Sequence, residues 1–152
     1  NVSNSLVLMA DRLGFSLTLA TPEPEETQES FDADLQAMIM DNPSIQRVED
    51  PRDAIASADF IYTDTWIDMQ YFNDPTKHAE KTALVAQMQR FQINSDLVAD
   101  HELKIMHDMP IHNDYEITEA AVRDSRSIIF DQAANRLHAQ KGLLYWLLVA
   151  NA

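Results

Sequence analysis

The chain has 152 residues, 45% of them hydrophobic, a size and composition typical of one compact domain. Only 11 Lys and Arg stand against 25 Asp and Glu, and the formal net charge of −14 argues against nucleic-acid binding, because such a surface repels phosphate backbones. The absence of cysteine excludes disulfides and thiolate metal sites and suits a cytoplasmic protein.

No apolar run approaches the roughly 20 residues that span a bilayer, so no membrane contact is expected. The chain begins at Asn1 inside an apolar pattern, from which we expect a piece of a longer protein.

Hydrophobic spacing and turn residues predict helices and strands that alternate along the chain. In chain order we expect a helix over 4–13, a strand over 15–20, a helix over 31–40, a strand over 45–50, a helix over 50–58, a strand over 59–64, a helix over 73–93, a helical turn over 94–101, a strand over 103–108, a helix over 118–124, a strand over 126–131 and a helix over 132–152. Gly14, Pro51 and either Asn94 or Ser95 stand where helix ends are expected.

The predicted strands are continuous apolar runs, which are typical of strands that are covered on both faces. The alternating order therefore predicts an α/β domain, with a mostly parallel sheet and helices on both faces. In such folds ligands bind at the carboxyl ends of the strands. The residues in these positions are Asp64, Thr65, Trp66, Ile67, Asp68, Met69, His107, Asp108, Met109, Pro110, Asp131 and Arg136.

Each of these residues also has a purely structural interpretation. Asp64 could cap the next segment, and Asp68 could simply be solvated on a loop. His107, at the end of an apolar strand, fits a hydrogen-bonded core histidine at least as well as a catalyst. Arg136 lies in a predicted helix, where arginine usually faces solvent or forms an ion pair.

Other site chemistries find little support in the sequence. His107, Asp108 and His112 could ligate zinc or iron, but their spacing matches no standard metal motif, and we expect no metal site. The chain has no glycine-rich phosphate loop and no serine or cysteine in a nucleophile elbow.

Several motifs taken together resemble a known family. The segments are "NVSNSL", "TDTWIDM", "FQIN", "MHDMPIHNDYEIT" and "RSIIFDQAANRLHAQKGLL", in this order. They resemble the second domain of the aspartate and ornithine carbamoyltransferases, and the ornithine enzymes most closely. The resemblance covers essentially residues 1–152 and implies a Rossmann-like, three-layer Asp/Orn-binding domain.

The resemblance also implies an activity and its context. The full-length protein would transfer a carbamoyl group from carbamoyl phosphate to an amine such as ornithine, in arginine metabolism, without a metal or organic cofactor. It would form a homotrimer or a multiple of trimers. The N-terminal domain that binds carbamoyl phosphate is absent from this chain, so the isolated domain is expected to be inactive.

The resemblance assigns roles residue by residue. Asn1 would contact ornithine, and Asp64 would bind the substrate's α-amino group, because a carboxylate holds an ammonium. Met69 falls on the methionine of the family's Ser-Met-Gly loop. Arg136 falls on an arginine that reaches the carbamoyl carbonyl, where it would polarise the electrophile.

The departures from the family pattern concern the same site. His-Cys-Leu-Pro is here His107-Asp108-Met109-Pro110, and the serine of Ser-Met-Gly is Asp68. We expect catalytic roles for His107, Asp108 and Arg136, and substrate contacts from Asp64, Asp68, Met69, Asp108, Met109 and Asn1.

The added carboxylates predict a preference for a more positively charged amine, or for a different polar head. The alternative is a divergent, non-catalytic relative that binds another cationic amine or acts as a regulatory module. The apolar "LLYWLLV" near the end of the chain predicts an exposed patch and self-association of the isolated domain.

Overall fold

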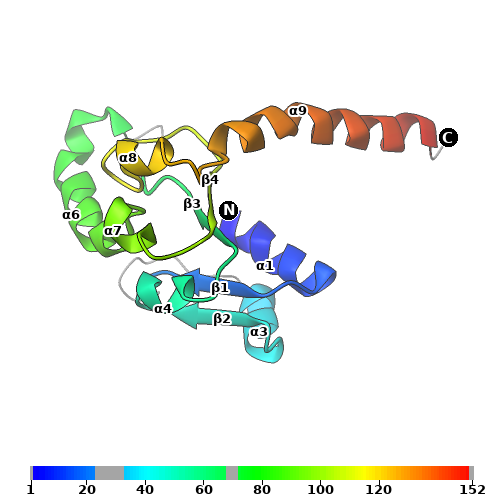
Figure 1. The fold of residues 1–152 in the computed structure, drawn as a ribbon, viewed down its shortest axis with the longest axis horizontal. Coiled ribbons are helices and arrows are strands. Elements are labelled where there is room, and N and C mark those ends of the chain that lie inside the picture. Colours follow the sequence, from blue (N-terminus) through cyan, green and yellow to red (C-terminus); the bar gives the residue numbers. More distant parts are fainter. Residues whose placement is uncertain (1, 23–32, 68–71, 151–152) are drawn as a thin grey trace.

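Helices and parallel strands alternate along the residues that the computed structural model describes, which are 2–22, 33–67 and 72–150. The elements are α1 (Val2–Leu13), β1 (Leu17–Ala20), α3 (Ala33–Asp41), β2 (Ile45–Val48), α4 (Pro51–Ile55), β3 (Phe60–Thr63), η1 (Pro75–Lys77), α6 (His78–Met88), η2 (Gln89–Phe91), α7 (Ser95–Val98), β4 (Lys104–His107), α8 (Glu119–Val122), α9 (Ile129–Tyr145) and η3 (Trp146–Ala150). Figure 1 shows this order from blue to red.

The strands pair in parallel, as the alternating sequence predicts. Among the described residues they form two two-stranded sheets, β1 with β2 and β3 with β4. In the second sheet Phe60 lies opposite Lys104, and Thr63 lies opposite His107. This register aligns the carboxyl ends of β3 and β4.

The strand predicted over 126–131 is wrong for most of its length. Ser127 forms a single parallel bridge with Ile105, and α9 already begins at Ile129. Gln132 N donates to Ile128 O at 2.8 Å, so the apolar run is taken into the first turn of a helix. A short apolar run fits a strand and a buried helix equally well, which explains the error.

Polar caps and one glycine set the helix ends. Gly14 has a φ of +73° and donates from its N to Ala10 O at 2.9 Å, which ends α1 in the left-handed conformation that glycine permits. Asn94 Oδ1 accepts from Leu97 N at 3.0 Å and starts α7. The predictions for Gly14 and Asn94 are therefore confirmed.

The buried apolar residues form two clusters, one beside each pair of strands. The first cluster joins α1, α3, β1 and β2 through Val7, Ala10, Leu19, Leu35 and Ile45. The second contains Ile55, Ile93, Leu97, Val98, Leu103, Ile105, Ile117, Ala121 and Ile129. It holds β4 between α7, α8 and the start of α9, and so fixes the strand end at His107.

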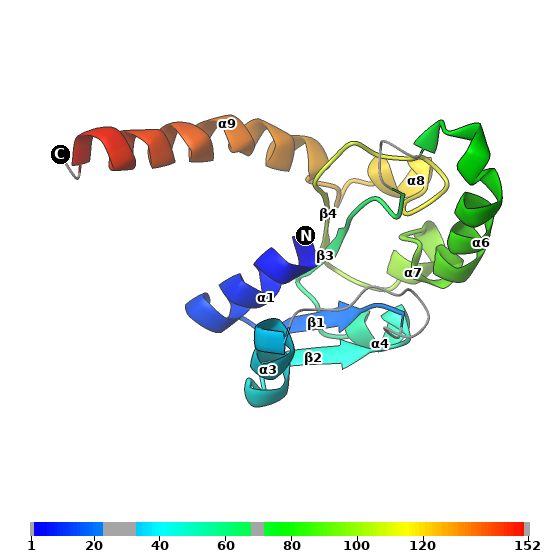
Figure 2. The ribbon, with the colours of Figure 1, turned by 180° about the vertical axis from the view of Figure 1, so that it is seen from behind.

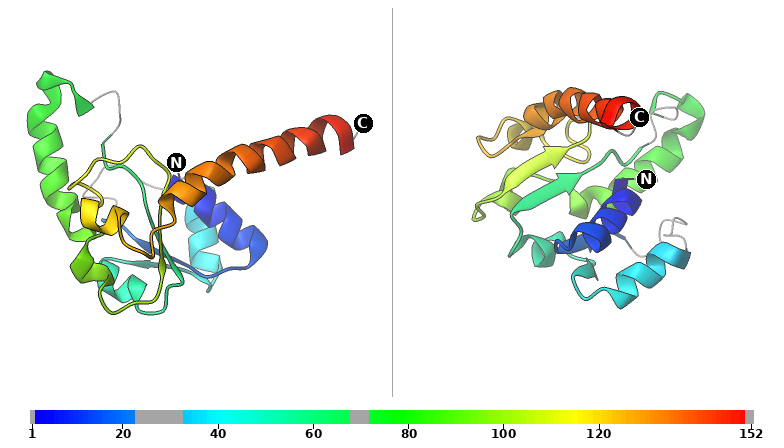
Figure 3. Two further views of the ribbon diagram at one scale, coloured as in Figure 1. Left: turned by 45° about the horizontal axis from the view of Figure 1, so that its top comes forward. Right: turned by 90° about the vertical axis from the view of Figure 1, so that its right-hand side faces the viewer.

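Helix α9 leaves the body of the domain and projects outward (Figures 1 and 2). The left view of Figure 3 also shows it separated from the other helices along most of its length. Of its residues only Ile129 is buried, whereas Leu144 is 56% exposed, and Trp146 and Leu148 of the following η3 are 55% and 70% exposed. The predicted exposed apolar segment is present. No helix among the described residues is both long enough and apolar enough to cross a membrane.

Candidate functional site

Two carboxylates lie side by side at the carboxyl ends of β3 and β4. Thr63 and His107 are paired as the last residues of these strands. Asp64 follows Thr63 directly, and Asp108 follows His107. Neighbouring strands lie about 4.8 Å apart, which brings these two acids together. Asp64 Oδ1 accepts from Thr65 N at 2.6 Å, whereas the buried Asp108 Oδ1 has no hydrogen-bond partner.

The two acids change the protonation of the groups around them. Burial raises the pKa of Asp108 above its ordinary value, and the negative charge of Asp64 raises it further, while His107 opposes the shift. Burial also raises the pKa of Tyr62 to about 12, together with the charges of Asp108 and Asp64 and against a hydrogen bond with Gln132. A positive charge placed between Asp64 and Asp108 would offset the repulsion between their carboxylates.

His107 is buried beside this pair, and both of its ring nitrogens have protein partners. Its Nε2 lies 3.1 Å from Glu116 Oε1, and its Nδ1 accepts from Met109 N at 2.8 Å. Its backbone N donates to Gln132 Oε1 of α9 at 3.1 Å. The His107 side chain is fully buried, and its Nδ1 contact with Met109 N ties it to the backbone of the loop after β4.

Glu116 is the residue of this region that sequence reasoning missed. Its side chain is fully buried, and its Oε1 accepts from His112 N at 2.6 Å as well as from His107. It lies nine residues after His107 in an irregular loop, and no periodic spacing in the sequence connects the two residues.

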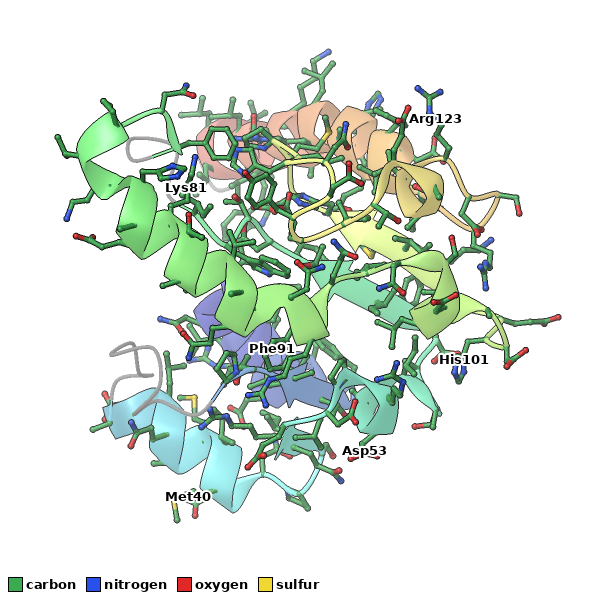
Figure 4. All side chains as sticks on the ribbon, turned by 90° about the vertical axis from the view of Figure 1, so that its left-hand side faces the viewer. Met40, Asp53, Lys81, Phe91, His101 and Arg123 are labelled. Carbon is green, nitrogen blue, oxygen red and sulfur yellow. The ribbon has the colours of Figure 1, made fainter. Side chains whose placement is uncertain are left out.

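An aromatic wall formed by Phe72, His112 and Tyr115 stands beside Thr65. The rings of Phe72 and His112 are stacked with centroids 3.9 Å apart, and His112 Nδ1 lies 2.7 Å from Thr65 Oγ1. Lys81 of α6 reaches this wall (Figure 4), where its Nζ lies 4.9 Å from the centre of the Phe72 ring. The aromatic wall therefore joins the loop after β3 to the loop after β4.

The remaining predicted residues are placed as follows. Met109 is 38% exposed with a φ of +57° and precedes Pro110 in a cis peptide bond. Arg136 is exposed on α9, one helical turn beyond Gln132 on the same face of the helix. Asp131 is also exposed on α9. Arg136 therefore lies on the helix that touches the site through Gln132.

Three predicted substrate contacts, Asn1, Asp68 and Met69, lie outside the described residues. Within the described part of the chain, no group of three His, Asp or Glu side chains is arranged to hold a metal ion. What the site presents is two carboxylates, one phenol and a backbone loop, which are groups that bind a cationic or hydrogen-bond-donating ligand.

Comparison with known proteins identifies the family. A family model described as "Aspartate/ornithine carbamoyltransferase, Asp/Orn binding domain" matches residues 1–147. The chain belongs to this family. The resemblance drawn from the motifs is confirmed, and the domain is a Rossmann-like α/β domain.

Among its relatives, the ornithine carbamoyltransferase of Archaeoglobus fulgidus is 35% identical over 150 residues, which is 97% of this chain and 46% of that protein. The catabolic ornithine carbamoyltransferase of Thermoplasma acidophilum is 38% identical over 151 residues, covering 97% of this chain and 48% of that protein. The structure of ornithine carbamoyltransferase from Pyrococcus furiosus has a TM-score of 0.75 and 32% identity, over 95% of this chain and 45% of that chain. The chain thus spans about half the length of these relatives.

Proposed function

We propose that this chain is the amino-acid-binding domain of an ornithine-type carbamoyltransferase. The full-length protein would transfer a carbamoyl group from carbamoyl phosphate to an amine such as ornithine, giving citrulline and phosphate. The observation that carries the proposal is the register of β3 and β4, which sets Asp64 and Asp108 side by side in a domain of this family.

The chemistry of carbamoyl transfer gives the two acids distinct tasks. An amine arrives as an ammonium ion and must be neutral before it can attack the carbamoyl carbon. In the proposed reaction the new C–N bond forms as the C–O bond to phosphate breaks, and the amine nitrogen loses a proton. Asp64 would hold the substrate's second ammonium group, and Asp108 would receive the proton.

The environment of Asp108 suits this task. Its carboxylate is a stronger base than that of an ordinary aspartate, because burial and Asp64 raise its pKa. Asp108 Oδ1 is buried 3.4 Å from His107 Nδ1, and the side chain as a whole is 32% exposed, which leaves the carboxylate open to a hydrogen bond from the amine. His107 would position the loop rather than touch substrate, since both of its ring nitrogens are bonded within the domain.

The other predicted residues complete the proposed site. Arg136 would polarise the carbamoyl carbonyl of the co-substrate, which an N-terminal domain of the full-length protein would bind. Asn1, Asp68, Met69 and Met109 would contact the amino acid. The proposed reaction uses no metal or organic cofactor, and the proposed assembly is a cytoplasmic homotrimer or a multiple of trimers.

Steady-state kinetics of the full-length protein with ornithine, lysine, putrescine and agmatine test the proposal. We expect phosphate release with at least one amine, and a loss of about 10–100-fold in kcat/KM for Asp64→Asn and Asp108→Asn, because each removes a charged hydrogen bond. Asp100→Asn, at an exposed acid in the turn after α7, is the matched control and should match the unmodified protein. A wild-type-like Asp108→Asn variant would contradict the role given to Asp108.

A second candidate function is a non-catalytic binder of cationic amines. The exposure of Arg136 on α9 favours it, together with the carboxylate of Asp108 at the position where the family pattern has a cysteine. Calorimetric binding of an amine to the full-length protein, without any phosphate release in the presence of carbamoyl phosphate, would support this function and refute carbamoyl transfer.

A further inference from the structure

The buried contacts around His107 define which of its ring nitrogens carries the proton. Met109 N donates to His107 Nδ1 at 2.8 Å, so Nδ1 presents its lone pair. His107 Nε2, 3.1 Å from a carboxylate oxygen of Glu116, is then the protonated nitrogen and donates. Since both side chains are fully buried, no solvent competes for either hydrogen bond.

Glu116 is tied to the other acid of the site as well. Thr65 Oγ1 lies 3.1 Å from Ile67 O and 2.7 Å from His112 Nδ1; when the Thr65 hydroxyl donates to Ile67 O, His112 Nδ1 is the donor to Thr65 Oγ1. The backbone N of His112 donates to Glu116 Oε1 at 2.6 Å, and Thr65 N donates to Asp64 Oδ1 at 2.6 Å. Three hydrogen bonds, linked through the covalent frames of His112 and Thr65, therefore connect Glu116 to Asp64.

From these contacts we propose that Glu116 is a positioning residue for the amine site. It holds His107 as the Nε2–H tautomer, and the Nδ1 lone pair then fixes Met109 N and with it the backbone that carries Asp108. Through His112 and Thr65 the same carboxylate fixes the loop that carries Asp64. The inference rests on the proposed function for its catalytic consequence, but its structural content is independent of that function.

Substitutions of Glu116 that differ in hydrogen-bonding capacity test the proposal in the full-length protein. Glu116→Gln keeps an oxygen that accepts from His107 Nε2–H and His112 N, so kcat/KM for the amine should stay within about threefold of wild type. Glu116→Met has a similar length but no strong acceptor. It should raise the KM for the amine or lower kcat, with kcat/KM falling about 10–100-fold, because misplacing a reacting group by about 1 Å has an effect of this size.

The KM for carbamoyl phosphate should change less than the KM for the amine in Glu116→Met, since the Glu116 side chain contacts the two loops that carry the acids and is linked to α9 only through the backbone of His107. Glu119→Met, at an exposed acid of α8, is the matched control. His107→Gln is a second test that does not disturb Glu116: it retains a donor toward Glu116 but removes the acceptor of Met109 N. It should lower kcat/KM for the amine as Glu116→Met does.

The ¹⁵N spectrum of selectively labelled histidine gives a readout that a general loss of stability would not produce. We expect His107 to show protonated Nε2 and unprotonated Nδ1 in the wild type and in Glu116→Gln, and a mixture of tautomers in Glu116→Met; the resonance is assigned by its loss in His107→Gln. An unchanged tautomer together with an unchanged amine KM in Glu116→Met would overturn the proposal. If the wild-type protein transfers no carbamoyl group, the proposed function fails, and the tautomer alone decides whether Glu116 orients His107.

Discussion

Replacing Asp108 with asparagine should stabilise the isolated chain at neutral pH even though it damages the proposed amine site. Asp64 and Asp108 follow directly paired residues at the ends of β3 and β4, so two negative charges face each other in the absence of a ligand. Burial and Asp64 raise the pKa of Asp108, which means that its charged form is disfavoured in the folded state. Asparagine has nearly the same shape and removes one of the two charges.

The size of the effect follows from the spacing of the strands. Two charges about 5 Å apart repel by roughly 1–2 kcal/mol at an effective dielectric constant of about 40–80, the range for groups that are partly open to water. The Asp108 side chain is 32% exposed, so solvent screening places the expected gain at the lower limit, about 1 kcal/mol.

The sign of the pH dependence follows from the direction of the shift. Because the pKa of Asp108 is raised on folding, the folded chain binds more protons than the unfolded chain between the ordinary and the raised pKa values. Stability contributed by this residue therefore falls as pH rises through that window, and the penalty is complete above it. The advantage of Asp108→Asn should be close to zero near pH 3 and larger at pH 7.

Urea unfolding followed by tryptophan fluorescence at these two pH values measures the difference. Asp100→Asn is the control and should change the free energy of unfolding by less than about 0.5 kcal/mol, as is usual for surface positions. An Asp108→Asn variant that is no more stable than wild type at pH 7, or that gains equally at pH 3, would refute the reasoning.

Three further predictions concern other parts of the chain. Ile105→Ala should lower the free energy of unfolding by about 2–5 kcal/mol in the urea assay, since Ile105 is completely buried in β4, and a loss below about 1 kcal/mol would contradict this. The isolated chain should self-associate with rising concentration in sedimentation velocity, and Leu144→Lys with Leu148→Lys should abolish this, because both leucines are exposed on the projecting helical segment; a monomeric wild type would count against it. Ultraviolet titration should show one phenol ionising near pH 12, and this step should vanish in Tyr62→Phe rather than persist.

The predicted elements agree best with the structure where local chemistry determines the backbone. The caps at Asn94 and Gly14 and the apolar runs of β3 and β4 need no distant partner to be recognised. The predicted helix over 73–93 is divided into η1, α6 and η2, because Asp74 and Pro75 start a 3₁₀ turn and η2 forms a second one at the other end. The alternation of helices and strands was thus predictable. The exact element boundaries, and the entry of residues 129–131 into a helix rather than a strand, depended on tertiary packing.

The candidate site divides in the same way. Asp64 and Asp108 could be predicted to lie together, because the carboxyl ends of neighbouring parallel strands share one edge. Glu116 could not, since its contact with His107 depends on the course of the irregular loop between them. The placement of Arg136 could not be predicted either, because the pattern of apolar and polar residues within α9 does not determine the direction in which the helix leaves the domain.

The buried polar residues beside the two acids, His107 and Glu116, bear on how the acids are held. Asp64 and Asp108 repel each other, and flexible loops would relieve that repulsion by moving apart. The hydrogen bonds that Glu116 accepts from His107 and His112 restrain both loops, so the loops cannot separate freely to relieve the repulsion. A cationic amine should then stabilise the folded chain in proportion to the logarithm of its concentration above Kd, and Glu116→Met should weaken that stabilisation even where the apo stability is unchanged.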